Sequence, residues 1–246
     1  MATTQKIAFI TGGNRGIGLE TARQLGKLGI TIVIGSRDAK KGEQAAQGLR
    51  TNGVDAQSLR CDVTKAEDHK AAYEFFEKKF GRLDILINNA GISIEQIGGA
   101  EHTSKVSPAI LRQVFEANFF APVALTQTLL PLIRRSPAGR IVNLSSILAS
   151  LTFHATPGSP IYDFNAFAYD TSKTAVNSFT VHLAHELRAT PIKVNSAHPG
   201  WVKTDMGGPN APMELADGGK TSTQLATLGP DGPTGGFFHL GEKLAW

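Results

Sequence analysis

The stretch Thr11-Gly12-Gly13-Asn14-Arg15-Gly16-Ile17-Gly18 joins a short apolar run, 7–11, to an amphipathic helical pattern, 16–27. Its glycines allow a sharp turn and a close approach of the backbone to a pyrophosphate. The N–H groups and the positive dipole at the start of the next helix favour the same anion. The spacing is TGxxxGxG rather than GxGxxG, but the flanking strand and helix disfavour a plain turn. We predict a dinucleotide site that includes Gly12, Asn14, Arg15, Gly16, Ile17 and Gly18.

Outward from this loop, β-rich segments alternate with helical patterns along most of the 246 residues. Strands are expected at 7–11, 31–35, 57–61, 83–88, 140–145, 193–197 and 237–239. Helices are expected at 16–27, 39–51, up to residue 80, past Asn118 and at 167–188. Strands that are apolar on both faces are typical of a parallel sheet covered by helices on both sides. Right-handed crossovers then favour a doubly wound α/β sheet, a Rossmann fold.

The chain shows no internal repeat and no linker long enough to separate domains. We therefore predict one catalytic domain, 1–246, that binds NADP. The region of about 205–235 is rich in glycine, proline and polar residues, and it is expected to form a mobile substrate loop with a short helix.

Composition excludes several classes of protein. The net charge is +4, but lysine pairs such as Lys40–Lys41 lie beside acidic residues such as Glu43, which indicates solvated helix faces and no nucleic-acid partner. The most apolar stretch, 119–133, is too short and too polar to span a bilayer. The N-terminus lacks an apolar signal region, and the single cysteine, Cys61, excludes an internal disulfide. We expect a cytoplasmic protein without a membrane partner.

The end of the second predicted strand indicates which cofactor binds. An acidic residue there would bond the ribose 2′-hydroxyl of NAD, but this strand is followed by Ser36 and Arg37. A small hydroxyl and a guanidinium suit a 2′-phosphate, and Arg15 could supply a second cation. Asp38 comes late enough to cap the next helix instead. The prediction is therefore NADP(H).

One tyrosine stands apart from the other two. Only Tyr169 has a lysine four residues later, Lys173, and on a helix this spacing places both side chains on one face. An adjacent cation lowers the pKa of a phenol from its usual value near 10, which makes it a better proton donor at neutral pH. Considered alone, the pair could be two ordinary surface residues of a helix with no catalytic role. The glycine loop favours the catalytic interpretation.

Taken together, these motifs resemble those of the short-chain dehydrogenase/reductase family, and within it the carbonyl-reductase-like branch. The matching pieces occur in the family's order from residue 6 to about residue 205. They are 11–18, Asp62-Val63, Asn88-Asn89-Ala90-Gly91, Asn118, Ser145-Ser146, Tyr169 with Lys173, and 199–205. Each motif alone is weak, but the ordered set is specific.

The resemblance implies a catalytic group. Tyr169 would be the general acid in carbonyl reduction and the base in the reverse direction. Lys173 would lower the pKa of Tyr169 and bond the nicotinamide ribose. Ser146 would donate a hydrogen bond to the substrate oxygen, and Asn118 would support a water that links Lys173 to solvent. The implied activity is the NADPH-dependent reduction of a ketone, aldehyde or quinone.

The resemblance also implies cofactor contacts. Asp62 and Val63 would meet the adenine, and Asn89 would lie on the adenosine side. Val202 and Thr204 would meet the nicotinamide amide. The implied set is completed by Ala90, Gly91, Pro199 and Gly200, together with Tyr169 and Lys173.

The chain departs from the family pattern at two places. Ala121 stands where the Asn118 motif often has glycine, a change expected to affect helix packing. Ser146 and Tyr169 lie 23 positions apart, which is more than usual, and the extra length lies in 150–167. We expect this insert to fold over the pocket, to help choose the substrate, and to favour a monomer or homodimer over a tetramer. Its flanking apolar residues, expected to pack on the body or line the site, are Leu151, Phe153, Ile161, Phe164 and Phe167.

Other chemistries receive less support. His182 and His185 have a spacing that can bind metal, but no third ligand is evident, so no metal is predicted. Ser146 and His198 lack the GxSxG elbow of a hydrolase, and His198 is expected to shape the nicotinamide pocket. Two alternatives stay open: an alcohol dehydrogenase that works oxidatively with NAD(P), and a non-catalytic NADP-binding sensor on the same fold.

Overall fold

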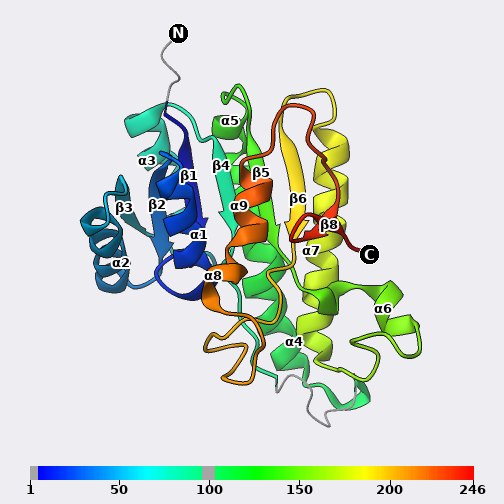
Figure 1. Ribbon diagram of the computed structural model, residues 1–246. Helices are drawn as coiled ribbons and strands as arrows, with labels where there is room; N and C mark the ends of the chain where they lie inside the picture. The colour runs from blue at the N-terminus through cyan, green and yellow to red at the C-terminus, as the bar shows by residue number, and fades with distance from the viewer. Residues whose placement is uncertain (1–4, 96–102) are drawn as a thin grey trace.

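The predicted alternation of strands and helices is present in the computed structural model, which describes residues 5–95 and 103–246 (Figure 1). The described strands form one sheet in the order β3-β2-β1-β4-β5-β6-β7-β8. Their bounds are β1 Ile7–Thr11, β2 Thr31–Ser36, β3 Ala56–Arg60, β4 Ile85–Asn88, β5 Arg140–Leu144, β6 Lys193–Ala197, β7 Phe237–His239 and β8 Glu242–Lys243. The single doubly wound α/β sheet is confirmed.

The last strand departs from the prediction. Neighbouring strands from β3 to β7 pair in parallel, whereas β8 pairs antiparallel with β7. The turn between them holds Leu240 and Gly241, both with positive φ. Two residues are too few to produce a hydrophobic alternation, so the sequence pattern could not show β8.

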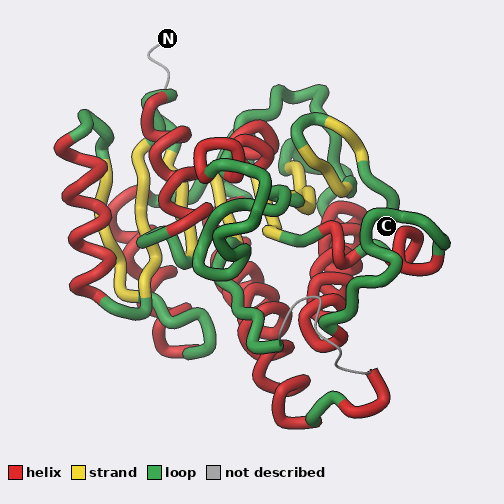
Figure 2. The backbone as a smooth tube through the Cα atoms, turned by 60° about the horizontal axis from the view of Figure 1, so that its bottom comes forward, coloured by secondary structure: helices red, strands yellow, loops and turns green. Residues whose placement is uncertain are grey.

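Helices cover both faces of this sheet, as Figure 2 shows. The α-helices are α1 Gly16–Lys27, α2 Ala39–Thr51, α3 Ala66–Phe80, α4 Pro108–Phe115, α5 Ala121–Ile133, α6 Leu151–Ala155, α7 Phe167–Glu186, α8 Leu215–Gly218 and α9 Lys220–Ala226. Shorter turns are the 3-10 helices η1 Thr103–Lys105 and η3 Ile147–Ala149, and the π-helix η2 Glu116–Phe120.

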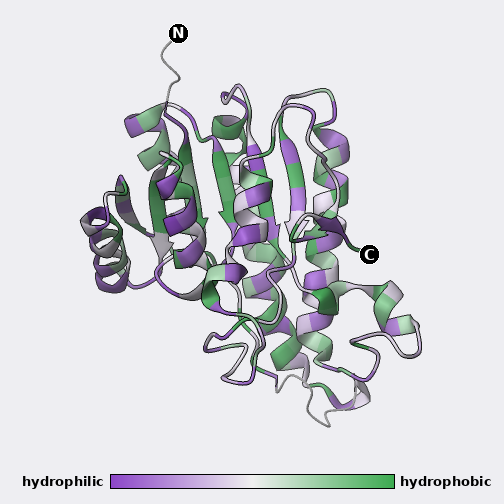
Figure 3. Ribbon diagram, in the orientation of Figure 1, coloured by the Kyte–Doolittle hydropathy of each residue, from purple (hydrophilic) through white to green (hydrophobic). Residues whose placement is uncertain are grey.

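Two apolar cores explain why the strands are hydrophobic on both faces. Along β1, Ile7 and Phe9 face the core shared with α3, α5 and α7, whereas Ala8 and Ile10 face the core shared with α1, α2 and α9. Successive side chains of a strand point to opposite faces, so a sheet with two covered faces needs apolar residues at every position. Figure 3 shows this hydrophobic colour along the central strands.

The long helix predicted past Asn118 is interrupted. Between α4 and α5 the chain forms the π-helix η2, which contains Asn118. Pro122 stands in the first turn of α5 and has no N–H to continue the regular hydrogen-bond ladder. Ala121, the residue that departs from the family pattern, is buried at this junction. Such π segments widen a helix locally and are frequent at functional sites.

The region of about 205–235 contains more helix than the one short helix predicted. It contains α8 and α9, and Leu225 and Ala226 of α9 are buried in the core on one face of the sheet. Gln24 of α1 ties the segment down by donating to the Ala216 carbonyl and accepting from the Thr223 hydroxyl. No helix in the described part of the chain is both long and apolar enough to cross a membrane.

Candidate active site

The motifs singled out in the sequence meet at one edge of the sheet. The glycine loop follows β1, Asn89 follows β4, Ser146 follows β5 and Pro199 follows β6. Because these strands are parallel, their carboxyl ends lie at the same edge, below the sheet in Figure 1. Ligands of open α/β sheets bind outside this edge, where the direction of winding reverses between β1 and β4.

Each glycine of the loop meets a separate requirement. Gly12 and Gly16 have φ of 62° and 54°, in the left-handed region that disfavours side chains. At Gly18, a Cβ would lie 2.5 Å from the Asn89 amide nitrogen and 2.8 Å from the Gly12 carbonyl oxygen. The helix that follows has no side-chain cap at Arg15. The N–H groups of its first turn are therefore available to an anion.

The segment after β4 holds this loop in place. The Asn89 side chain donates to the Thr11 carbonyl at 2.8 Å and to the Gly12 carbonyl at 3.3 Å. The Thr11 hydroxyl accepts from the Asn89 and Ala90 amides, both at 3.0 Å. Through these hydrogen bonds the Asn89 side chain fixes the backbone of the glycine loop.

Ser36 and Arg37 differ in their availability at the end of β2. Ser36 is buried, and its hydroxyl donates to the Asp38 carbonyl at 2.8 Å, whereas Arg37 is exposed. Asp38 caps α2 by accepting from the Lys41 amide at 3.0 Å, which confirms the role expected for it. Arg37 is thus an exposed cation at this corner, and the small side chain of Ser36 precedes it.

Asp62 lies beside the same corner, after β3. Partial burial acts to raise the pKa of Asp62, but hydrogen bonds from Thr64 hold that pKa below its usual value. The charges of Lys65 and Arg37 act in the same direction. Val63 packs against the core. The ends of β2 and β3 therefore lie close enough for the charges of Arg37 and Asp62 to interact.

The segment after β6 closes over the glycine loop. Arg15 forms an exposed ion pair with Asp205. Thr204 also lies near the loop, because a Cβ on Gly16 would be 3.9 Å from its methyl carbon. Val202 is buried and pairs with Met213 in an isolated bridge. Residues 202–205 thus lie across the site from the first turn of α1.

Tyr169 and Lys173 share one face of α7, as predicted. Both side chains are buried, and the Lys173 ammonium lies 5.7 Å from the centre of the Tyr169 ring. Burial raises the pKa of Tyr169 to about 12, although a hydrogen bond with Ser146 acts to lower it. The sequence predicted a lowering by Lys173, but that ammonium donates to the Leu144 carbonyl at 2.8 Å. Burial lowers the pKa of Lys173 itself to about 8.

Asn118 lies next to this pair and is fully engaged. Its amide oxygen accepts from the Ile92 amide at 2.8 Å, and its nitrogen donates to the Ile92 carbonyl and the Ser172 hydroxyl. A Cβ on Gly91 would lie 3.1 Å from the Asn118 oxygen and 3.4 Å from the Lys173 nitrogen. Asn118 and Lys173 both line a cavity of about 10 Å³, close to the space that one water needs.

Ser146 and His198 connect the loops after β5 and β6. The Ser146 hydroxyl caps the turn η3 by accepting from the Leu148 amide at 3.2 Å. His198 Nδ1 accepts from the Ile147 amide at 3.2 Å and from the Gly200 amide at 3.4 Å. Burial and the neighbouring His239 lower the pKa of His198 to about 3, so its ring is neutral. The sequence suggested that His198 shapes this pocket but gave no sign of its hydrogen bond with Ile147, the residue after Ser146.

Glu95 is a residue that the sequence analysis missed. Its buried carboxylate accepts from the Ala168 amide at 3.0 Å and from the Tyr169 amide at 2.8 Å. It thereby caps α7 from a loop 74 positions earlier in the chain. No local pattern marks such a cap, because the capping residue normally directly precedes the helix.

The insert packs beside Tyr169. Ile161 is buried in a cluster with Tyr169, and Phe153 is partly buried against it. Leu151 and Phe164 differ from the expectation for the flanking apolar residues, because they are exposed by 62% and 39%. The side of the insert that packs on Tyr169 is thus buried, whereas Leu151 and Phe164 on its other side are exposed to solvent.

The remaining candidates lie outside the site. His182 and His185 are exposed on α7, and Cys61 is buried, with its pKa raised to about 12 by burial. A raised pKa keeps the thiol protonated and unreactive. Among the described residues, no group of three His, Cys, Asp or Glu side chains could hold a metal ion.

Comparison with known proteins assigns the family. The short chain dehydrogenase family matches residues 6–215. The chain is 30% identical to human carbonyl reductase [NADPH] 1 over the whole of both proteins, and 30% identical to (-)-isopiperitenone reductase of Mentha piperita over 100% of this chain and 99% of the relative. The structure of NADPH-bound carbonyl reductase from chicken fatty liver superposes with a TM-score of 0.83 at 26% identity, covering 99% of this chain and 100% of that one. The glycine loop, the Tyr169–Lys173 pair and these full-length matches place the chain in the short-chain dehydrogenase/reductase family of oxidoreductases.

Proposed function

We propose that this protein reduces a ketone, aldehyde or quinone carbonyl to an alcohol with NADPH. The observation that carries the proposal is the convergence of Tyr169, Lys173 and Ser146 beside the glycine loop. Two segments that lie apart in the sequence bring these groups together: α7 supplies the proton donor and the cation, and the loop after β5 supplies the hydroxyl. The relatives named as NADPH-dependent carbonyl reductases support the same reaction.

The residues fit a dinucleotide. Gly12 and Gly16, whose φ angles are positive, and the uncapped start of α1 form a cradle that a side chain would fill. The free N–H groups of the first turn of α1 suit a pyrophosphate. Exposed Arg37 and Arg15 offer cations for a 2′-phosphate, and no acidic residue ends β2. Asp62, Val63, Ala90, Gly91, Pro199 and Gly200 would line the remainder of that site, with Val202 and Thr204 near the nicotinamide.

The proposed chemistry is a hydride and a proton transfer. A nicotinamide cofactor, when bound, supplies the hydride to the carbonyl carbon. Ser146 donates a hydrogen bond to the carbonyl oxygen, where negative charge develops, and Tyr169 delivers its proton to that oxygen. A pKa of about 12 keeps Tyr169 protonated at neutral pH. The positive charge of Lys173 stabilises the phenolate that remains. Lys173 is positively charged below its pKa of about 8.

Direct measurement of cofactor use tests the proposal. We expect NADPH to bind at least about tenfold more tightly than NADH, a difference of about 1.4 kcal/mol. In a panel of ketones, aldehydes and quinones, several should accelerate the loss of NADPH absorbance. Tight NADPH binding without turnover of any substrate would instead support a sensor. A preference for NAD and alcohols would support an oxidative dehydrogenase.

We further propose that the insert, 150–167, helps choose the substrate and favours a monomer or homodimer. The support is its position, because Ile161 packs in the cluster that contains Tyr169. Replacing 152–165 by a tight turn should change the substrate profile and the mass measured by light scattering. An unchanged mass together with an unchanged profile would remove this role.

A further inference from the structure

One imidazole of the insert contacts the turn that carries Ser146. His154, on α6, places its Nε2 3.0 Å from the Leu148 carbonyl oxygen. A carbonyl oxygen only accepts, so Nε2 carries the proton in this hydrogen bond. Leu148 belongs to η3, and the Ser146 hydroxyl is the N-cap of this turn. His154 therefore bonds the carbonyl of the same residue whose amide donates to the Ser146 hydroxyl.

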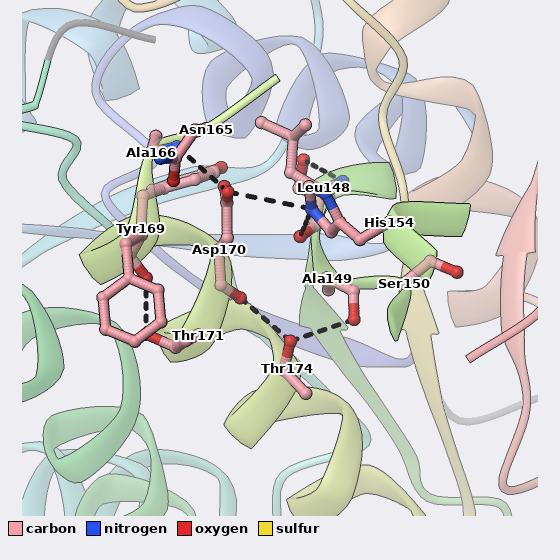
Figure 4. A network of polar contacts seen from close by, with 12 residues as sticks. Leu148, Ala149, Ser150, His154, Asn165, Ala166, Tyr169, Asp170, Thr171 and Thr174 are labelled. Atoms are coloured by element: carbon pink, nitrogen blue, oxygen red, sulfur yellow. Dashed lines mark hydrogen bonds and ion pairs between the residues drawn. The ribbon is translucent and has the colours of Figure 1, made fainter. Parts of the chain in front are cut away.

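The same nitrogen faces the helix that carries Tyr169. Nε2 of His154 lies 3.7 Å from Oδ2 of Asp170, the residue that directly follows Tyr169 on α7. Figure 4 shows the imidazole between the two segments, with Asp170 on one side and Leu148 on the other. Oδ2 of Asp170 also accepts from the Ala166 amide at 3.0 Å. His154 thus donates to the segment that presents Ser146 and lies beside a carboxylate of the helix that presents Tyr169.

A second link runs parallel to the first. The Thr174 hydroxyl lies 3.0 Å from the Ala149 carbonyl of η3 and 3.0 Å from the Asp170 carbonyl of its own helix (Figure 4). A hydroxyl has one proton, so it can donate to only one of these oxygens at a time. Thr174 and the Nε2–H of His154 thus each offer one proton between α7 and η3 on this side.

Asp170 is poised to respond to its surroundings. Its Oδ1 is buried and has no hydrogen-bond partner among the described residues. The titratable groups that face it are His154 from α6, Glu95 from the loop after β4, and Tyr169 beside it on α7. Burial, together with repulsion from Glu95, raises the pKa of Asp170 to about 7. Near neutral pH the carboxyl therefore exchanges a proton while it faces the imidazole.

We propose that His154, acting with Asp170, is a positioning residue that fixes the Ser146 turn against the catalytic helix. The inference rests on the proposed reductase function, and it gives the insert a specific task beside Tyr169. The Ser146 hydroxyl and the Tyr169 phenol must both contact the carbonyl oxygen of the substrate. A small shift of η3 relative to α7 would therefore move one of them out of reach. His154 does not touch the substrate and acts only through Leu148 and Asp170.

Substitution of His154 tests this role. In H154A, kcat should fall about tenfold through misplacement of Ser146, while KM for NADPH stays within about twofold. H154Q should recover most of kcat, because its amide N–H can donate to the Leu148 carbonyl. H185A, which removes an exposed histidine of α7, is the matched control and should behave as the parent protein. A kcat of H154A within about twofold of the parent overturns the proposal.

The pH profile separates positioning from bulk packing. As the pH rises through about 7, Asp170 ionises and its attraction for the His154 N–H strengthens, so kcat should carry an inflection there. D170N cannot ionise and should lose this inflection, while the effect of Lys173 near pH 8 remains. An inflection near pH 7 that survives in D170N contradicts the role of Asp170.

A third measurement does not require turnover. In the protein without substrate, amide hydrogen exchange of residues 147–150 should be about tenfold faster in H154A and near the parent rate in H154Q. If exchange is faster in H154A but the parent protein reduces no carbonyl, the positioning role of His154 holds and the proposed reductase function is wrong. If exchange is unchanged in H154A and the parent protein is active, the positioning role of His154 is wrong and the proposed function holds.

Discussion

Replacing Tyr169 with phenylalanine is expected to lower kcat for carbonyl reduction by about a thousandfold, within the range of general acid catalysis. The substitution removes the proton that Tyr169 holds at neutral pH, because burial keeps the pKa of this phenol near 12. The ring remains and preserves the packing with Ile161 and Ala166. The NADPH dissociation constant, measured by fluorescence, should therefore change by no more than a few-fold, as expected when only a substrate-directed group is lost.

Tyr73 provides the matched control, because it lies on α3 and packs against the core outside the proposed site. Tyr73→Phe should keep the parent kcat. Lys173→Ala should reduce both kcat and NADPH affinity, since Lys173 is proposed to stabilise the phenolate and to touch the ribose. Most of the parent activity retained in Tyr169→Phe would show that another group donates the proton.

The second large effect concerns cofactor choice. Ser36→Asp combined with Arg37→Ile should reverse the preference, from NADPH at least about tenfold tighter to NADH at least about tenfold tighter. The new carboxylate would bond a ribose 2′-hydroxyl and repel a 2′-phosphate, and the exposed cation beside it would be gone. Dissociation constants for both cofactors, measured at one salt concentration, give the two ratios.

Arg188→Ile supplies a control for the lost positive charge, because Arg188 is exposed at the far end of α7. It should leave both dissociation constants unchanged. Arg37→Ile alone should weaken NADPH and leave NADH nearly unaffected, which separates loss of the phosphate contact from gain of the hydroxyl contact. Equal affinities for the two cofactors in the parent protein would refute the assignment of Arg37.

The sequence by itself determined the sheet and the location of the site. Apolar runs on both faces of β1, β2 and β4 are a local property of the chain, and they predicted a doubly wound sheet. Glycine spacing in 11–18 predicted the turn that Gly12 and Gly16 make with positive φ. The spacing of Tyr169 and Lys173 predicted one shared helix face. Each inference uses residues within a few positions of each other, where periodicity and backbone geometry act directly.

Tertiary structure alone decided how the site is supported and charged. Glu95 caps α7 from 74 positions away, His198 links two loops, and His154 lies between η3 and Asp170. The pKa of Tyr169 also ran against the prediction, because burial outweighs a nearby lysine that bonds elsewhere. These contacts depend on which segments meet after folding and how much water they exclude. Neither quantity is encoded in local periodicity, so a sequence pattern can name the reacting groups but not the environment that sets their protonation.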